Sequence, residues 1–324
     1  MSSTSTIIGH EDQIRSLLAD VEADNVAHAY LFTGKNHIGK FTAAKWFAHT
    51  LLTADAAGAE ELVRLHHEID KLIHQDLFVI DQLWIEGVCE DFDVIARTSN
   101  VPQQERAKKK AKTDTVGIDD IRSLQERLHE VSGGRYRCCL IRNVDRLQEE
   151  AVNALLKILE EPPAGVVFIL TATSTSSLLP TLVSRARVLR FFPLPTRLLH
   201  PLVQDAPSQD AQFLLRLAQG APGVVLRLKD DPDLLRAERQ RYSQAVAFWH
   251  ASTLAERLKL LEPLAERTDD ARQYLLHLSL ALREEREGIP VPRALALQDL
   301  VRDLQQTNVS RPLLLQRFAL AISV

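Results

Sequence analysis

The sequence has little cysteine, no long apolar run and no excess of positive charge. Only three of its 324 residues are cysteines, and the neighbours Cys138 and Cys139 point to opposite faces of a strand, so no disulfide framework fits. We therefore expect a reducing, cytoplasmic compartment. No apolar run reaches the roughly 20 residues that cross a membrane, and the first residues lack the features of a signal peptide. The net charge of −4 argues against a protein whose main role is to bind nucleic acid.

The first two thirds of the chain alternate between strand-like and helix-like patterns. Helices are expected at residues 11–22, after the glycine loop that begins at Gly34, from Gly117 to about 131, and at 149–161. Strands alternating with helices predict an α/β core, a mostly parallel sheet with helices on both faces. The expected strands are Ala29–Thr33, 77–81, Cys138–Val144, Val166–Thr173 and Val188–Phe192.

After about residue 195 the strand patterns stop. The remainder is rich in leucine and helical in its periodicity, and a Gly-Ala-Pro-Gly segment at 220–223 separates the first two of these helices. A chain of this length is long enough for two or three domains. We predict an α/β domain at 1–195, a small helical domain at 196–232 and an all-helical domain at 233–324.

The glycine loop between the first strand and its helix is the strongest local signal. In the segment Gly34–Phe41, Gly34 and Gly39 allow backbone N–H groups to face a phosphate, and Lys40 and the helix N-terminus add positive charge. Such loops need a serine or threonine after the lysine to ligate magnesium, but Phe41 is there instead. Thr42 is a poor substitute, because one step along a helix turns a side chain by about 100°. Phe41 instead extends an apolar stripe, so we expect it to pack.

A second signal lies at the end of the strand expected at 138–144. Phosphate-loop ATPases carry there an Asp that holds magnesium, often followed by a Glu that orients water, but this chain has Arg142 and Asn143. A cation about 4 Å from another repels it by roughly 4 kcal/mol near a protein surface. Asp145 lies further on, where we expect helix entry or a salt bridge. The chain is therefore predicted not to hydrolyse nucleotide, and no cofactor is required. Two alternatives remain for the pocket: it binds ATP or ADP weakly, as a vestigial or magnesium-independent site, or it is empty.

Two other polar clusters have mainly structural interpretations. His67, Asp70 and His74 have the three- and four-residue spacing of one helix face, which can hold a metal, but without thiolates zinc is disfavoured and exposed histidines are expected. His66 and Asp76 lie beside them. The basic run Arg106–Lys112 indicates a solvated loop, with a contact to a phosphate backbone as the alternative.

Three segments carry a resemblance to a known family. Asn153–Pro163 resembles the NALLKxLEEPP signature of the clamp-loader AAA+ proteins, and His28–Phe32 resembles the HAYLF strand of that family. Ser184–Ala186 is similar to its SRC motif, with alanine in place of cysteine. The resemblance covers about residues 7–230 well. It implies an AAA+ core in the first domain, a lid in the second and an oligomerisation collar in the third.

The resemblance also assigns roles. It implies that Arg185, with Ser184 beside it, is an arginine finger acting in trans on a neighbour's ATP. The family often follows Gly-x-Pro-Gly with a basic residue that senses the nucleotide, and Val224 replaces it. The family's small zinc module is built from cysteines, which residues 53–76 lack. Implied partners are gamma/tau-like and delta-like clamp-loader subunits, with the sliding clamp and primed DNA reached through the complex, and no membrane.

Two other functions remain as alternatives. The chain could be an active AAA+ ATPase of the gamma type that uses Thr42 and Asp145 as unusual ligands. It could also be a structural adaptor without a clamp-loading role, although the retained Ser184 and Arg185 argue against this.

Overall fold

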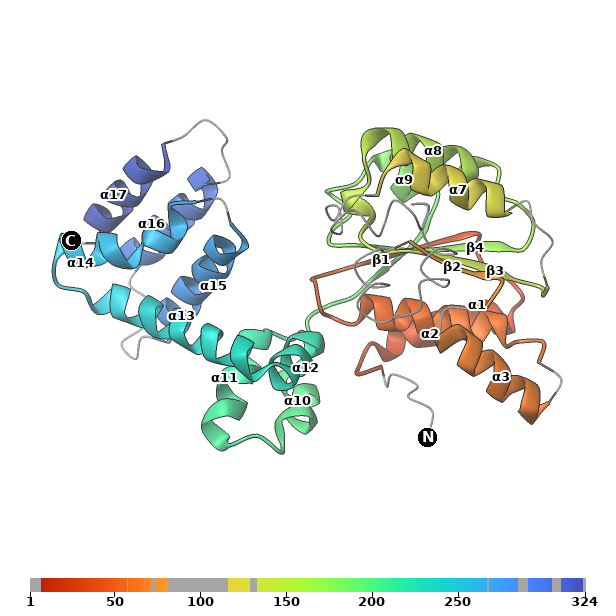
Figure 1. The fold of residues 1–324 in the computed structure, drawn as a ribbon, viewed down its shortest axis with the longest axis horizontal. Coiled ribbons are helices and arrows are strands. Elements are labelled where there is room, and N and C mark those ends of the chain that lie inside the picture. Colours follow the sequence, from red (N-terminus) through yellow and green to blue (C-terminus); the bar gives the residue numbers. More distant parts are fainter. Residues whose placement is uncertain are drawn as a thin grey trace, which may run out of the picture. The chain divides into compact units, whose positions relative to one another are not determined.

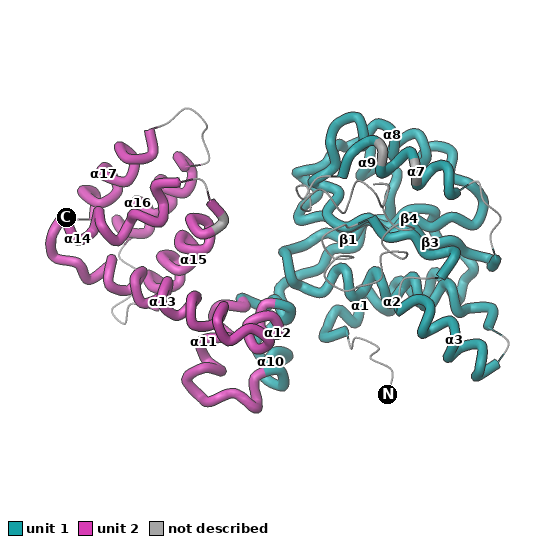
Figure 2. Tube along the Cα trace, viewed as in Figure 1, with its two compact units in different colours: residues 1–202, 219–223 teal, residues 203–218, 224–324 magenta. Residues whose placement is uncertain are grey.

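The computed structural model describes residues 7–56, 58–70, 74–80, 116–128, 133–266, 268–284, 291–304 and 310–322. By its internal contacts the chain forms two compact units, shown in Figure 2. The first comprises residues 1–202 and 219–223, and the second comprises residues 203–218 and 224–324. The basic run 106–112 lies outside the described residues. The three-domain division remains a prediction.

The first unit contains a parallel sheet with the order β2-β3-β4-β1-β5 (Figure 1). Every pair of neighbouring strands is parallel, as the alternation of strands and helices predicts. All residues of β1, β3 and β4 are buried, which explains why these strands appear in the sequence as nearly continuous apolar runs. The strands are β1 (Ala29–Thr33), β2 (Leu77–Ile80), β3 (Arg137–Ile141), β4 (Val166–Ala172) and β5 (Arg187–Arg190).

Helices cover both faces of this sheet (Figure 1). Side chains alternate along β1, as the period of two in a strand requires. Tyr30 and Phe32 join the core with α2, whereas Ala29 and Leu31 join the core with α8. One face carries α1 (Glu11–Glu22), α2 (Lys40–Leu52) and α3 (Ala59–Asp70), and the other carries α7 (Ile118–Leu128), α8 (Glu149–Glu160) and α9 (Pro180–Ser184). The unit also contains α10 (Thr196–Leu199).

The strand expected at 138–144 ends earlier than predicted. β3 stops at Ile141, and Asn143 has a φ of 55°, in the left-handed region that asparagine tolerates better than most residues. The chain then forms a short 3₁₀ helix, η1 (Val144–Arg146). The left-handed turn therefore takes Val144 out of the strand, and Val144 is buried in the core beside α8.

A buried ion pair fastens β3 to the turn before β2. The Arg137 side chain is 5% exposed and that of Asp76 is 1% exposed, and their Nε and Oδ1 atoms are 3.2 Å apart. Arg137 also donates to the carbonyl oxygens of Arg127 and Leu128, and Asp76 Oδ2 accepts the N–H of Gly133. The pair therefore joins β2, β3 and the end of α7.

The second unit is helical in the part that the structure describes. Its core is aromatic at the centre, with Phe248 stacked on Phe318 at 5.4 Å and Trp249 donating to the carbonyl oxygen of Leu278. In the described part of the whole chain, none of the helices has the length and hydrophobicity needed to cross a bilayer. The helices are α11 (Ser208–Ala218), α12 (Pro222–Asp230), α13 (Pro232–His250), α14 (Leu254–Leu260), α15 (Asp269–Arg283), α16 (Val291–Leu304) and α17 (Arg311–Ala321), with the 3₁₀ helix η3 (Glu262–Leu264). The 3₁₀ helix η2 (His200–Val203) and the first two residues of α12 belong mainly to the first unit.

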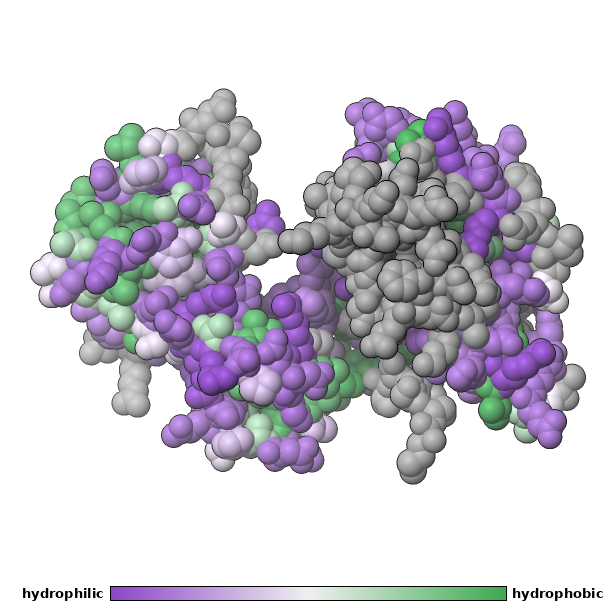
Figure 3. All heavy atoms as spheres, in the orientation of Figure 1, coloured by the Kyte–Doolittle hydropathy of each residue, from purple (hydrophilic) through white to green (hydrophobic). Residues whose placement is uncertain are grey.

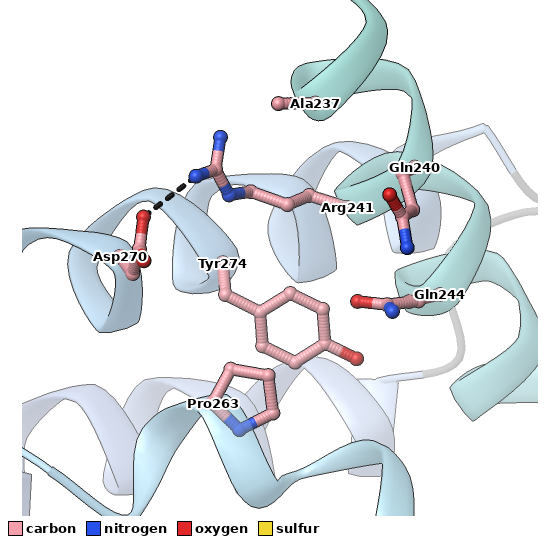
Figure 4. A pocket seen from close by; sticks show the side chains of 7 residues that line it. All are labelled: Ala237, Gln240, Arg241, Gln244, Pro263, Asp270 and Tyr274. Atoms are coloured by element: carbon pink, nitrogen blue, oxygen red, sulfur yellow. Dashed lines mark hydrogen bonds and ion pairs between the residues drawn. The ribbon is translucent and has the colours of Figure 1, made fainter.

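A cleft of about 220 Å³ lies between α13, α15 and η3 (Figure 4). Arg241 crosses it and donates to Asp270 at 2.6 Å and to the buried Glu238 at 2.9 Å. The Tyr274 hydroxyl is buried and has no hydrogen-bond partner among the described residues. The lining side chains are Ala237, Gln240, Arg241, Gln244, Pro263, Asp270 and Tyr274.

Two buried tyrosines should respond differently to loss of the hydroxyl. Tyr30 donates to Asp20 at 2.9 Å and accepts the N–H of Ala27 at 3.0 Å, so Tyr30→Phe should lower the free energy of unfolding by about 1–3 kcal/mol. Tyr274→Phe removes a hydroxyl without a partner, so it should be neutral or stabilising by up to about 1 kcal/mol. Chemical denaturation of both variants measures the difference. Equal losses would contradict the expectation for Tyr274.

Candidate functional site

The glycine loop lies between β1 and α2, at the carboxyl edge of the sheet. Gly34 has a φ of +150°, and a Cβ there would lie 2.4 Å from the Phe191 carbonyl oxygen, so only glycine fits. Gly39, with a φ of +106°, caps the N-terminus of α2. The helix therefore begins at Lys40, as a phosphate loop requires.

The loop is held on several sides by its own unit. His10 contacts the Ile38 carbonyl oxygen through its Nε2 atom at 3.0 Å, and burial lowers the pKa of this histidine. The N–H of Gly223 donates to the carbonyl oxygen of His37 at 2.9 Å, and the Lys35 ammonium donates to Gln219 at 3.0 Å. The sequence motif alone does not reveal these contacts, because they come from the N-terminal segment and from residues 219–223.

Lys40 is buried and folded back onto the loop. Its Nζ atom donates to the carbonyl oxygens of Gly34 at 2.5 Å and Lys35 at 2.9 Å. Burial lowers the pKa of Lys40 to about 8, while the charge of Asp145 raises it and that of Arg142 lowers it. The charge of Asp145 therefore offsets only part of the cost of burying the Lys40 ammonium.

This lowered pKa predicts a pH dependence of stability. Between pH 8 and 10.5 the unfolded chain keeps the Lys40 proton that the folded chain has released, so stability should rise with pH in this window. Relative to Lys40→Met, the wild type should gain about 1–3 kcal/mol from pH 7 to pH 10. Denaturant unfolding of both proteins at several pH values measures this, with the exposed Lys157→Met as the control. A pH-independent difference between wild type and Lys40→Met would contradict the expectation.

The two residues that replace the magnesium ligands contact each other. The Arg142 guanidinium carbon lies 5.4 Å from the centre of the Phe41 ring, within the range of a cation–π contact. Phe41 also packs against the core between α2 and the sheet, as expected from its stripe. An aromatic ring and a guanidinium offer no oxygen ligand, so this part of the loop does not fit a magnesium ion.

The other polar residues of this edge have protein partners. The backbone N–H of Asn143 donates to Thr171 at 2.9 Å, and Asp145 Oδ2 accepts a hydrogen bond from Thr173 at 2.9 Å. Asp145 Oδ1 is buried without a partner in the described part of the chain. Thr173 was not predicted, although a polar residue after a buried strand marks the carboxyl edge where ligands bind in such sheets. Thr42, the proposed substitute ligand, is half-buried in the first turn of α2.

The histidine cluster is arranged differently from the prediction. α3 ends at Asp70, so His74 does not share a helix face with His67 and Asp70, because it lies outside the helix. Asp70 pairs with Lys45 at 2.9 Å, and His74 accepts the N–H of Asp76. Among the described residues, no three His, Cys, Asp or Glu side chains lie close enough to hold a metal ion.

Arg185 lies in a different layer from the loop. It caps the C-terminus of α9, whose Leu182 is buried in the core with α8. Its Nη2 donates to Glu160 at 2.8 Å and its Nη1 to the Thr181 carbonyl oxygen at 3.0 Å. The exposed Ser184 hydroxyl donates to the same carbonyl. The Arg185 side chain is 33% exposed, so its guanidinium is held in place and still open to solvent.

The sheet, its two helical layers and the glycine loop define an AAA+ fold, as the sequence resemblance predicted. A DNA polymerase III gamma subunit-related protein of Thermotoga maritima has a similar structure, with a TM-score of 0.51 and 15% identity, covering 95% of this chain and 98% of that one. The model of the family DNA polymerase III, delta subunit, matches residues 9–195. The chain therefore belongs to this family.

Curated relatives carry related names. The DNA polymerase III subunit delta' of Escherichia coli is 37% identical over 119 residues, which are 36% of each chain. The gamma/tau subunit of Mycobacterium tuberculosis is 26% identical over 238 residues, 71% of this chain and 37% of that protein. The match thus spans 37% of the length of this gamma/tau relative. Val224, which stands where the family often has a basic residue, lies in the first turn of α12 in the second unit.

Proposed function

We propose that this chain is a delta'-type subunit of a replicative clamp loader that does not hydrolyse ATP itself. It helps to load a sliding clamp onto primed DNA and supplies Arg185 to the ATP of a neighbouring subunit. The family and the delta' and gamma/tau relatives support the clamp-loader part. The contact between Phe41 and Arg142 supports the absence of hydrolysis, because it pairs an aromatic ring with a guanidinium at the two sequence positions where a phosphate-loop ATPase has magnesium ligands.

The loss of hydrolysis follows from the chemistry of the loop. Phosphoryl transfer needs a metal to neutralise the developing charge and a group that orients water. Here Arg142 and Asn143 replace the carboxylates, and the half-buried Thr42 stands one residue too late. Asp145, the remaining acid, accepts from Thr173. No cofactor is needed for this role.

The position of Arg185 supports a role in trans. β5 runs parallel to β1, and Arg185 comes just before the amino end of β5. The glycine loop follows the carboxyl end of β1, so the arginine and the loop lie toward opposite edges of the sheet. An exposed, restrained guanidinium is suited to stabilise charge on a phosphate supplied by another subunit. Ser184 shapes the turn that presents it.

The helical second unit supports assembly with partners. Figure 3 shows apolar side chains at the surface of this unit over α14 and α17, where Leu254, Leu313 and Leu320 are 40%, 64% and 55% exposed. Exposed apolar patches mark interaction surfaces. We assign this surface to contacts with gamma/tau-like and delta-like subunits, and the clamp and DNA to contacts through the complex, in the cytoplasm beside the replisome.

Purified chain, incubated with ATP and magnesium, tests the proposal. We expect the rate of ATP hydrolysis by the wild-type chain to be no higher than that of Lys40→Ala. In a separate pull-down, we expect the chain to co-purify with gamma/tau-like and delta-like subunits. Magnesium-dependent turnover that Lys40→Ala abolishes would instead establish an active ATPase using Thr42 and Asp145. Failure to assemble with those subunits would favour a structural adaptor and contradict the clamp-loading role.

A further inference from the structure

We infer that Glu160 is a positioning residue for Arg185, holding its guanidinium in the orientation that the neighbouring ATP site needs. This inference rests on the proposed role of Arg185 in trans. Glu160 belongs to the Leu-Glu-Glu-Pro-Pro segment, and the sequence pattern alone assigns no role to either of the two glutamates in it.

The contact fixes the side chain at two points. Arg185 Nη2 donates to Glu160 Oε1 at 2.8 Å, and Nη1 donates to the carbonyl oxygen of Thr181 at 3.0 Å. The carbonyl lies on the same helix as the turn that carries Arg185, but Glu160 comes from α8, the neighbouring helix. The carboxylate therefore ties the arginine to the rigid layer of α8, which the local turn alone does not do.

The geometry leaves the arginine able to act. A guanidinium has five N–H donors, and these two bonds use two of them. The remaining donors and the 33% exposure of the side chain allow an outside anion to bind while Glu160 stays in place. Restraint before binding reduces the entropy lost when the arginine meets a phosphate.

The position of Glu160 gives a second argument. It is the last residue of α8, where the helix dipole disfavours a negative charge. Glu160 thus does not stabilise its own helix. Glu161, the C-cap residue next to it, has the same charge and no ion pair in the described part of the chain, so it provides a matched control.

The experiment uses the assembled complex. Glu160→Ala should lower the kcat of ATP hydrolysis at the neighbouring site, measured as single-site turnover, by about threefold to tenfold with an unchanged KM for ATP, because an arginine that acts only in the transition state is displaced. Glu160→Gln keeps an acceptor oxygen and should restore part of the loss. Glu161→Ala should match the wild type. The double variant Glu160→Ala/Arg185→Ala should be no slower than Arg185→Ala, since the effects of coupled residues do not add.

A second readout is independent of catalysis. In the isolated full chain, NMR of the Arg185 side chain should show increased mobility in Glu160→Ala but not in Glu161→Ala, with thermal unfolding unchanged. If Arg185→Ala lowers the complex ATPase but Glu160→Ala behaves like Glu161→Ala, the positioning role is wrong and the proposed function stands. If Arg185→Ala itself has no effect, the trans role fails and the positioning role fails with it.

Discussion

Arg185→Ala is expected to lower ATP hydrolysis at the neighbouring site of the assembled complex by about 10³-fold or more, the range of arginine fingers in general. The physical reason is that the guanidinium stabilises charge that develops on the transferred phosphate. The effect on the whole complex is smaller, because only the site next to this chain loses its arginine. The isolated chain should fold normally, since the side chain is partly exposed and its partners Glu160 and Thr181 are near the surface.

The measurement is single-site turnover in a complex reconstituted with the variant. Arg190→Ala is the matched control, because Arg190 is an exposed arginine on the strand that follows the same turn. A complex that assembles and hydrolyses ATP equally well with Arg185→Ala would rule out the trans role. Weak assembly with this variant, by contrast, would indicate that the arginine contributes to the interface rather than to the reaction.

Asp76→Ala is expected to lower the free energy of unfolding by about 3–5 kcal/mol, the largest stability effect that the structure predicts. The variant leaves the Arg137 guanidinium buried without its carboxylate and removes the acceptor of the Gly133 N–H. Taking a lone charge out of water is far more costly than losing an exposed pair. Chemical denaturation measures the loss.

Two further variants make this test specific. Asp24→Asn removes an ion pair with Arg135 whose side chains are 67% and 49% exposed and keeps a residue that tolerates the left-handed backbone there, so it should cost less than about 1 kcal/mol. Replacing both partners, Asp76→Leu with Arg137→Met, should restore much of the stability lost in Asp76→Ala, because no buried charge then remains unpaired. Similar losses for Asp76→Ala and Asp24→Asn would contradict the burial argument.

Much of the fold follows from the sequence because it rests on local patterns. The buried strands appear as apolar runs, and the helices of the first unit appear with apolar stripes, of which Ala44, Phe47, Ala48 and Leu51 are all buried. The glycine loop is recognisable because its backbone requires glycine at Gly34. Boundaries are less certain: β3 ends at Ile141 because a left-handed Asn143 follows, and no periodicity encodes that turn.

The α/β core, the residues that replace the magnesium ligands and the segments that mark the family can be recognised from local patterns in the sequence. Which side chains contact one another depends on the three-dimensional fold. Phe41 contacts Arg142, Asp76 pairs with Arg137, and Arg185 pairs with Glu160 across different elements. The fold also separates His74 from the helix face of His67 and Asp70. The physical reason is that a local pattern fixes which face of a strand or helix is buried, whereas the order of strands in the sheet and the layering of helices fix the partner found there.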